Sequence, residues 1–207
     1  QERGFTGITV DFWWGIIEPA PKEYNFHPFL QLIKQVKTKG LKLKVILSFH
    51  ACGNTIGDQC NFPLPKWVLE SGNHFFYQDQ NGKINNEYIS IFADDLELKD
   101  GRTVLQVYED LIAEFDKQFQ VFYEEVIVNI ELGVGPAGQL HYPSYSYPNG
   151  FCGVGFFQWY GDLATSKFHQ FLDTISIVDS PKRLNIFKQL PSPTLSNLNH
   201  KPNKENF

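Results

Sequence analysis

Short apolar runs alternate with longer amphipathic stretches along most of the chain. The apolar runs are rich in β-branched residues, predict β-strands, and lie at residues 7–10, 41–47 and 126–130. One amphipathic helix is predicted to begin after Pro28 and end at Gly40, and a second to span about 102–118. Strands that alternate with helices pair in parallel through right-handed crossovers. Because the strands are almost continuously apolar, we expect cover on both faces of the sheet.

Two stretches depart from this alternation. Asn81-Gly82 predicts a tight turn, with a small excursion off the main sheet around it. Residues 180–207 show no sustained period, and they hold five basic residues against one acidic residue, with four prolines and five asparagines. We therefore predict an α/β domain over 1–179 and a disordered basic tail over 180–207.

Each predicted strand delivers a polar residue at its C-terminal end. These residues are Asp11, His50 and Glu131. The carboxyl ends of parallel strands meet at one edge of a sheet, where α/β folds collect their chemistry. Each residue alone has an ordinary interpretation, since an aspartate can cap a turn and a histidine can be a hydrogen-bonded core residue. All three together favour a functional site.

Composition and charge exclude several kinds of partner. The formal net charge is −5, so no excess of cations is available to neutralise phosphates and no nucleic-acid partner is expected. No apolar run approaches the roughly 18 residues that span a bilayer, and no basic-then-apolar leader opens the chain. We expect a soluble protein, with the cytoplasm as the favoured location.

The cysteines are few and unevenly placed, unlike a disulfide framework. They are Cys52, Cys60 and Cys152. Cys52 and Cys60 lie near His50 and His74, which raises the question of a metal site, but the spacing matches no zinc pattern. We expect unpaired thiols, no metal and no cofactor.

Aromatic residues make up 15% of the chain, which suits either a large core or a surface for flat ligands. Around the polar strand ends, Trp13, Trp14 and Phe49 could stack on such a ligand. Core packing explains aromatic residues that flank strands at least as well, so we do not count them as site residues.

Longer motifs resemble the β-amylase family. The principal ones are VDFWWGIIE from Val10, LKLKVILSFHACGNTIGD from Leu41, and GVGPAG from Gly133 with LHYPSY after it. NFPLPKWV, NEYISI and GRTVLQVYEDL occur in the family's order as well. The resemblance covers about residues 3–175. It implies a TIM-type (β/α)₈ barrel that releases maltose from the non-reducing ends of α-1,4-glucans, with inversion.

Carried over position by position, the resemblance implies that Asp11, His50 and Asp58 bind the sugar nearest the bond that is cleaved. The chemistry agrees, because carboxylates accept and imidazole can donate hydrogen bonds, and sugar hydroxyls do both. Asp58 would lie on a mobile loop after the second predicted strand. Gly53 and Gly57 would serve as its hinges.

The catalytic pair implied by the family is incomplete here. Inversion uses two carboxyl groups about 6.5–9.5 Å apart, one as acid and one as base. The family's acid ends the motif GPAGE, whereas this chain reads GPAGQ and has Gln139 at that position. An amide has no proton to give, and loss of a general acid costs about 10²–10⁴ in rate. Glu131 could substitute as the acid, although an orienting role is the stronger interpretation.

On this alignment the chain corresponds to a partial barrel, about strands 2–4 of the family's eight. The expected base lies in the C-terminal part of the family, which residues 1–207 do not match. A partial barrel leaves two strand edges and the inner face of the sheet open, so we expect self-association or a complementing chain.

Three functions fit these observations. The first is a β-amylase-type hydrolase, fragmentary or degenerate, with at best weak activity. The second is a non-catalytic α-glucan-binding or regulatory protein that keeps Asp11, His50 and Asp58. The third is a structural remnant without a ligand. The partner in the first two is an α-1,4-glucan or a maltose-type sugar.

Overall fold

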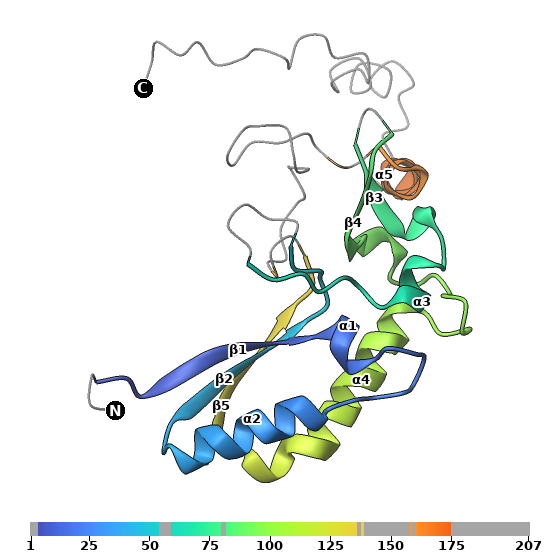
Figure 1. Ribbon diagram of the computed structural model, residues 1–207. Coiled ribbons are helices and arrows are strands. Elements are labelled where there is room, and N and C mark those ends of the chain that lie inside the picture. The colour runs from blue at the N-terminus through green and yellow to red at the C-terminus, as the bar shows by residue number, and fades with distance from the viewer. Residues whose placement is uncertain are drawn as a thin grey trace, which may run out of the picture.

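The computed structural model describes residues 4–53, 59–79, 82–135, 138, 158 and 160–174. Within them a parallel sheet has the strand order β1–β2–β5 (Figure 1). The strands are β1 Gly7–Trp13, β2 Lys42–Ser48 and β5 Ile127–Gly133. The parallel pairing predicted from the alternation of strands and helices is confirmed.

Two strands run further than the apolar pattern predicts. β1 continues past Val10 to Trp13, and β5 continues past Ile130 to Gly133. Asp11 and Glu131 therefore lie within strands, near their C-terminal ends, rather than after them. The pattern stops short because polar side chains on one face of a strand interrupt an apolar run without ending the strand.

Two long helices, α2 His27–Thr38 and α4 Val104–Phe119, cover one face of the sheet (Figure 1). Phe12 of β1 joins both helices in the core. Its ring stacks on Phe29 of α2, with 4.1 Å between centroids, and meets the edge of Phe115 of α4 at 5.8 Å. All three side chains are buried, so much of the aromatic content belongs to the core.

Local signals set the ends of these helices. Pro28 occupies the first turn of α2, where its missing N–H is not needed, and the chain leaves the helix through Gly40 at φ 62°. A capping box begins α4: the Thr103 hydroxyl accepts from the backbone N–H of Gln106, and the Gln106 side chain accepts from the N–H of Thr103.

The opposite face of the sheet carries no helix among the described residues, so the expected cover on both faces is wrong for this part of the chain. In β2 the residues facing α2 and α4 are Leu43, Val45 and Leu47, all buried. Lys42 and Lys44 alternate with them. The sequence LKLKVIL was therefore already the pattern of a strand with one apolar and one polar face.

Between β2 and α4 the chain leaves the sheet and forms an antiparallel hairpin, which confirms the predicted excursion. Gly82 lies in its turn with φ 80°, a value that favours glycine. The elements of this excursion are α3 Lys66–Leu69, η1 Asn73–Phe75, β3 Phe76–Gln78, β4 Ile84–Ile89 and η2 Ile91–Ala93.

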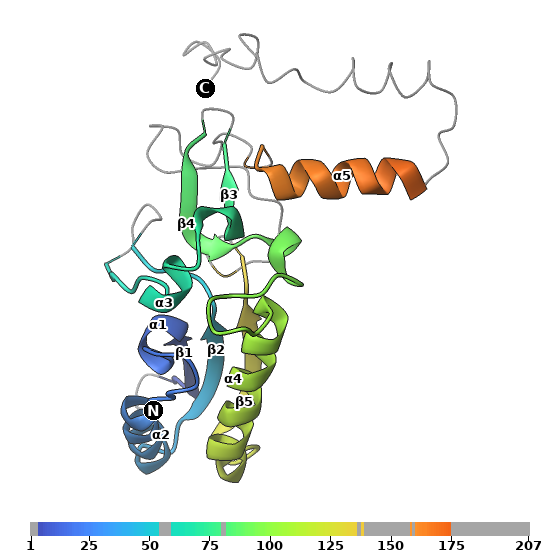
Figure 2. The ribbon, with the colours of Figure 1, turned by 90° about the vertical axis from the view of Figure 1, so that its right-hand side faces the viewer.

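The last described helix, α5 Asp162–Thr174, lies beside the hairpin (Figure 2). Lys167 of α5 forms an ion pair with Asp95 at 3.1 Å. The remaining short elements are α1 Trp14–Ile17, directly after β1, and η3 Gln120–Phe122, directly after α4.

The described residues form an α/β structure with a partial sheet and no closed barrel. Residues 175–207 lie outside them, so the boundary predicted at residue 179 and the disordered tail predicted over 180–207 stay predictions.

Candidate functional site

The register of the sheet arranges the open face into rows. Residues paired in parallel strands share a face, so the polar residues of neighbouring strands line up. From the middle of the sheet toward the C-terminal edge the rows are Thr9, Lys44 and Asn129; then Asp11, Ile46 and Glu131; then Trp13, Ser48 and Gly133. Two of the predicted site residues thus lie in one row.

Asp11 is fixed by its neighbour on β2. The hydroxyl of Ser48 donates a hydrogen bond to Oδ1 of Asp11 at 2.8 Å, and the Ser48 side chain is buried. This bond restrains the Asp11 carboxylate, which can accept further hydrogen bonds from hydroxyl groups. Sequence reasoning missed Ser48 because the pairing partner of Asp11 depends on the register of two strands.

His50 lies just beyond the end of β2 and is only 8% exposed. Its ring meets Trp13 edge-on, with 5.2 Å between ring centroids. Nδ1 of the ring lies 3.4 Å from the carbonyl oxygen of Gly133 at the end of β5. The backbone N–H of Ala51 donates to the carbonyl of Glu87 in β4 at 2.6 Å. His50 is therefore held between the sheet and the hairpin.

Glycines let the chain approach the His50 ring closely. A Cβ atom at Gly133 would lie 3.4 Å from Cε1 of His50, and one at Gly138 only 3.0 Å away. Gly138 also has φ +78°, which L side chains rarely adopt. The glycine-rich segment after β5 is thus explained in part by its packing on an imidazole.

Glu131 forms an ion pair with Lys44 of β2 at 2.6 Å. An ion pair needs the carboxylate, whereas a general acid must carry a proton, so this contact favours the orienting role. Asp11 and Glu131 flank Ile46 in the same row, which separates their backbones by two strand spacings, about 10 Å.

Of the aromatic residues near the site, Trp14 and Phe49 belong to the core, as core packing predicted. Trp13 differs. It is half-buried, shares the open face with Asp11, and contacts both His50 and Phe62. The two-residue period of a strand could have identified it, because residues 11 and 13 point to the same side.

Cys52 and Cys60 form a disulfide, so the expectation of unpaired thiols at these positions is wrong. No sequence signal predicts this disulfide, because the pairing depends on a backbone reversal. Cys52 and Phe62 bond as an isolated antiparallel bridge, which brings the two cysteines together. Cys152 lies outside the described residues. Within the described part of the chain, no group of three or more histidine, cysteine or acidic residues could hold a metal ion.

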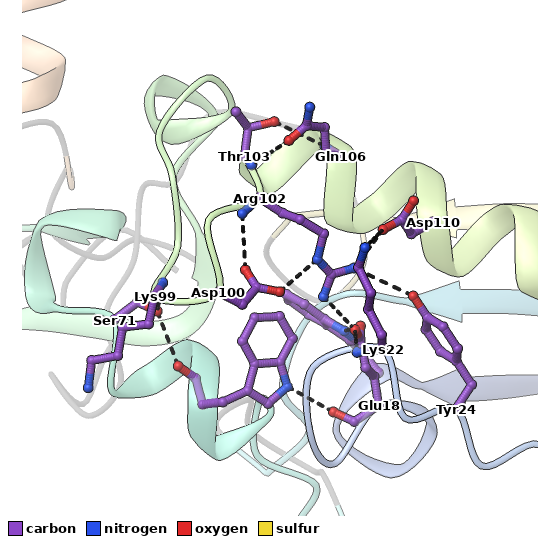
Figure 3. Close-up of polar contacts among 12 residues, drawn as sticks. Glu18, Lys22, Tyr24, Ser71, Lys99, Asp100, Arg102, Thr103, Gln106 and Asp110 are labelled. Carbon is purple, nitrogen blue, oxygen red and sulfur yellow. Dashed lines mark hydrogen bonds and ion pairs between the residues drawn. The ribbon is translucent and has the colours of Figure 1, made fainter.

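A buried charged cluster close to the end of β1 was also missed (Figure 3). Glu18, 0% exposed, accepts hydrogen bonds from Arg102 at 2.8 Å and from the indole N–H of Trp14 at 2.9 Å. Arg102 also bonds Asp100 at 2.6 Å and Asp110 of α4 at 2.8 Å.

This cluster affects the acidity of its members. Burial alone would lower the pKa of Arg102, but its hydrogen bonds to Glu18, Asp100 and Asp110 outweigh burial and raise that pKa, so the guanidinium stays charged. Burial, together with the charge of Glu18, raises the pKa of the neighbouring Tyr24. The cluster joins the segment after α1 to the segment before α4.

A cavity of about 530 Å³ lies elsewhere, against β3 and the start of α5. Tyr77, Gln78 and Asp162 are among its lining residues, and the predicted site residues that the structure describes, Asp11, His50 and Glu131, do not line it. Two predicted site residues, Asp58 and Gln139, lie outside the described residues.

No helix in the described ranges is long and apolar enough to cross a membrane; the cytoplasmic location stays a prediction.

The described residues thus form an α/β protein whose parallel strands carry a carboxylate, a serine and an imidazole at or near their C-terminal ends. Barrel enzymes place their active sites at that edge of the sheet. The chain matches the family described as glycosyl hydrolase family 14 over residues 1–206, and it belongs to that family. The resemblance drawn from the motifs is confirmed.

Relatives of known identity match most of the chain. The β-amylase of Medicago sativa is 43% identical over 175 residues, which is 81% of this chain and 35% of that protein. Chloroplastic β-amylase 2 of Oryza sativa subsp. japonica is 44% identical over 167 residues, 77% of this chain and 30% of that protein.

A solved structure agrees. The catalytic domain of β-amylase from Paenibacillus polymyxa superposes with a TM-score of 0.70 at 32% identity, over 84% of this chain and 41% of that chain. The present chain spans about a third of the length of the curated relatives it matches.

Proposed function

We propose that this chain binds the non-reducing end of an α-1,4-glucan at the edge formed by β1 and β2, and that it hydrolyses the glucan weakly or not at all. Asp11, His50 and Asp58 are the binding residues of this proposal. The observation that carries it is that Asp11, restrained by Ser48, shares a strand face with Trp13, whose ring contacts His50. These groups offer acceptors, a donor and an aromatic surface to sugar hydroxyls and rings.

The proposed loss of hydrolysis rests on position 139. Gln139 stands where the family's motif has its acid, and an amide cannot protonate a leaving oxygen. Glu131 is a poor substitute because Lys44 pairs with its carboxylate. The glutamine at position 139 also favours the second candidate function, a non-catalytic glucan-binding or regulatory protein.

Binding is tested by calorimetric titration of the 207-residue chain with maltose and maltotetraose. We expect measurable affinity, and we expect Asp11→Asn to weaken it about 10–100-fold, the effect of losing a hydrogen bond to a charged group. Glu109→Gln on the exposed side of α4 is the matched control and should bind as the unchanged chain does. A folded chain that binds neither sugar would contradict the proposal and would favour the third function, a structural remnant without a ligand.

Catalysis is tested separately by maltose release from starch. The unchanged chain should release little or none. Gln139→Glu, joined to the C-terminal half of a β-amylase relative, should release maltose if the chain is an impaired hydrolase. Binding without release from that fusion would favour the non-catalytic function.

A further inference from the structure

The disulfide between Cys52 and Cys60 lies beside the candidate site. Cys52 follows His50 by two residues and is 6% exposed, whereas Cys60 is half-buried. Their Cα atoms are 5.7 Å apart, within the range that a disulfide spans. Cys60 is thus the more exposed residue of the pair, which favours attack by a reagent in solution at Cys60 over Cys52.

A continuous set of contacts connects the disulfide to His50. The backbones of Cys52 and Phe62 exchange two hydrogen bonds, of 2.9 and 3.0 Å. The Phe62 ring lies 5.6 Å from Trp13, and Trp13 lies 5.2 Å from His50, centroid to centroid. A displacement of Phe62 would therefore disturb the packing of Trp13 directly and that of His50 through Trp13.

The two backbones approach closely next to the disulfide. Gly53 has φ +112°, and a Cβ atom there would lie 2.8 Å from the carbonyl oxygen of Cys60. Only glycine fits such an approach without a shift of the backbone. Gly53 thus permits the close backbone approach that brings Cys60 next to Cys52, where the chain reverses direction beside His50.

We infer that Cys52–Cys60 is a reversible redox site whose disulfide form holds the sugar-binding edge together and whose dithiol form binds sugar more weakly. This inference rests on the proposed function, because it names a regulation of the same site. After reduction, the two backbone hydrogen bonds between Cys52 and Phe62 would have to hold these segments together without the disulfide. The segments would then be less ordered in the free protein, and the entropy cost of ordering them on binding would lower the affinity for sugar.

The reductant is a dithiol. One of its thiolates attacks Sγ of Cys60, the more exposed residue; the S–S bond breaks and Cys52 leaves as a thiolate, which takes up a proton. The second thiol of the reductant then attacks the mixed disulfide and releases Cys60 as a thiol. Two electrons and two protons pass to the protein, and the reductant becomes a disulfide.

The test uses the full chain with Cys152→Ser, which leaves only the pair of interest. Thiol titration should find no free thiol after oxidation and two after treatment with dithiothreitol. Calorimetry should give a maltose Kd about tenfold higher for the reduced form, the size of effect expected when a site must be ordered on binding. Adding Cys60→Ser should give the weaker Kd under both conditions.

Backbone hydrogen exchange provides a readout that needs no sugar. Reduction should speed exchange at the amides of Cys52 and Phe62, and leave the amide of Leu111 in α4 unchanged. Equal exchange and equal Kd in the two states would overturn the inference, as would two free thiols in the oxidised sample. Faster exchange on reduction, with maltose bound by neither form, would instead contradict the proposed function and support the redox coupling.

Discussion

Close packing holds the side chain of His50 in place. A Cβ atom at Gly138 would lie 3.0 Å from its ring and could not be added without adjustment, one at Gly133 would just touch the ring at 3.4 Å, and Trp13 contacts the same ring edge-on. The position of this imidazole therefore depends on the absence of side chains as much as on hydrogen bonds.

Gly138→Ala tests this packing. The new Cβ would lie 3.0 Å from Cε1 of His50, so the ring must move, and we expect a roughly tenfold loss of maltose affinity together with a changed His50 imidazole NMR signal. Calorimetry and histidine NMR are the measurements.

Gly101→Ala is the matched control. Gly101 has nearly the same backbone angle, φ +81°, but a Cβ atom there meets nothing within 4 Å. Both variants lose stability through backbone strain, about 1 kcal/mol, whereas only Gly138→Ala should change binding and the His50 signal. Equal behaviour of the two variants would show that packing on His50 is immaterial.

At the scale of elements, the Glu18–Arg102 cluster joins parts of the chain that share no sheet. Glu18 follows α1, Arg102 precedes α4, and the Arg102 guanidinium lies 5.6 Å from the ring of Trp67 in α3. The indole N–H of Trp67 donates to the carbonyl of Glu18 at 3.0 Å. Three helices are thus positioned around one buried ion pair (Figure 3).

Removing the two partners of this pair should have unequal effects. Arg102→Met leaves the carboxylate of Glu18 buried without a cation and should cost about 3–5 kcal/mol in the free energy of unfolding. Glu18→Gln should cost less, because Arg102 keeps Asp100 and Asp110. The double variant should cost less than the sum of the two, and urea denaturation measures all three.

The exposed ion pair between Lys37 and Glu125 serves as the comparison. Lys37→Met should cost less than about 1 kcal/mol, as surface pairs do. Strictly additive effects of the two changes at the buried pair would contradict its role as a coupled unit.

The elements themselves could largely be predicted from the sequence. The strands and both long helices follow from periodicity. Pro28 marks the start of α2 because its fixed φ and missing N–H suit the first turn, and Gly40 marks the end because glycine readily adopts the positive φ that follows a helix. The strand ends at Trp13 and Gly133 could not be predicted this way, since a half-polar strand and a loop look alike in an apolar pattern.

The site could be predicted only in part. The convergence of strand ends is enough to predict Asp11, His50 and Glu131 as candidates, but the partners Ser48 and Lys44 depend on register, which no single strand encodes. The charged cluster gave no local signal either: Arg102 and Glu18 are 84 residues apart.

At the scale of the whole molecule, the open sheet predicts association. On the edge strands β1 and β5, Ile8, Val128, Ile130 and Leu132 are 38–54% exposed. Neither strand has a further strand beside it among the described residues. Exposed apolar side chains next to unpaired backbone groups are a template for pairing with another chain.

We therefore expect the 207-residue chain to show a concentration-dependent rise in sedimentation coefficient. Leu132→Glu should shift the chain toward the monomer, because it places a charge on the edge strand. Leu105→Glu on α4 is the control: Leu105 is 52% exposed against 51% for Leu132, but it lies on a helix. A strictly monomeric chain at all concentrations would contradict this expectation.

The separation of Glu18 from Arg102 also matters while the chain is being made. β1 and α1 leave the ribosome long before residue 102 is added, and the 84 residues between the partners take about 4–17 s at 5–20 residues per second. During that time Glu18 lacks its partner Arg102, and β2 lacks its neighbouring strand β5. The first quarter of the chain must wait for α4, and we expect the nascent chain to be accessible to chaperones and proteases during that interval.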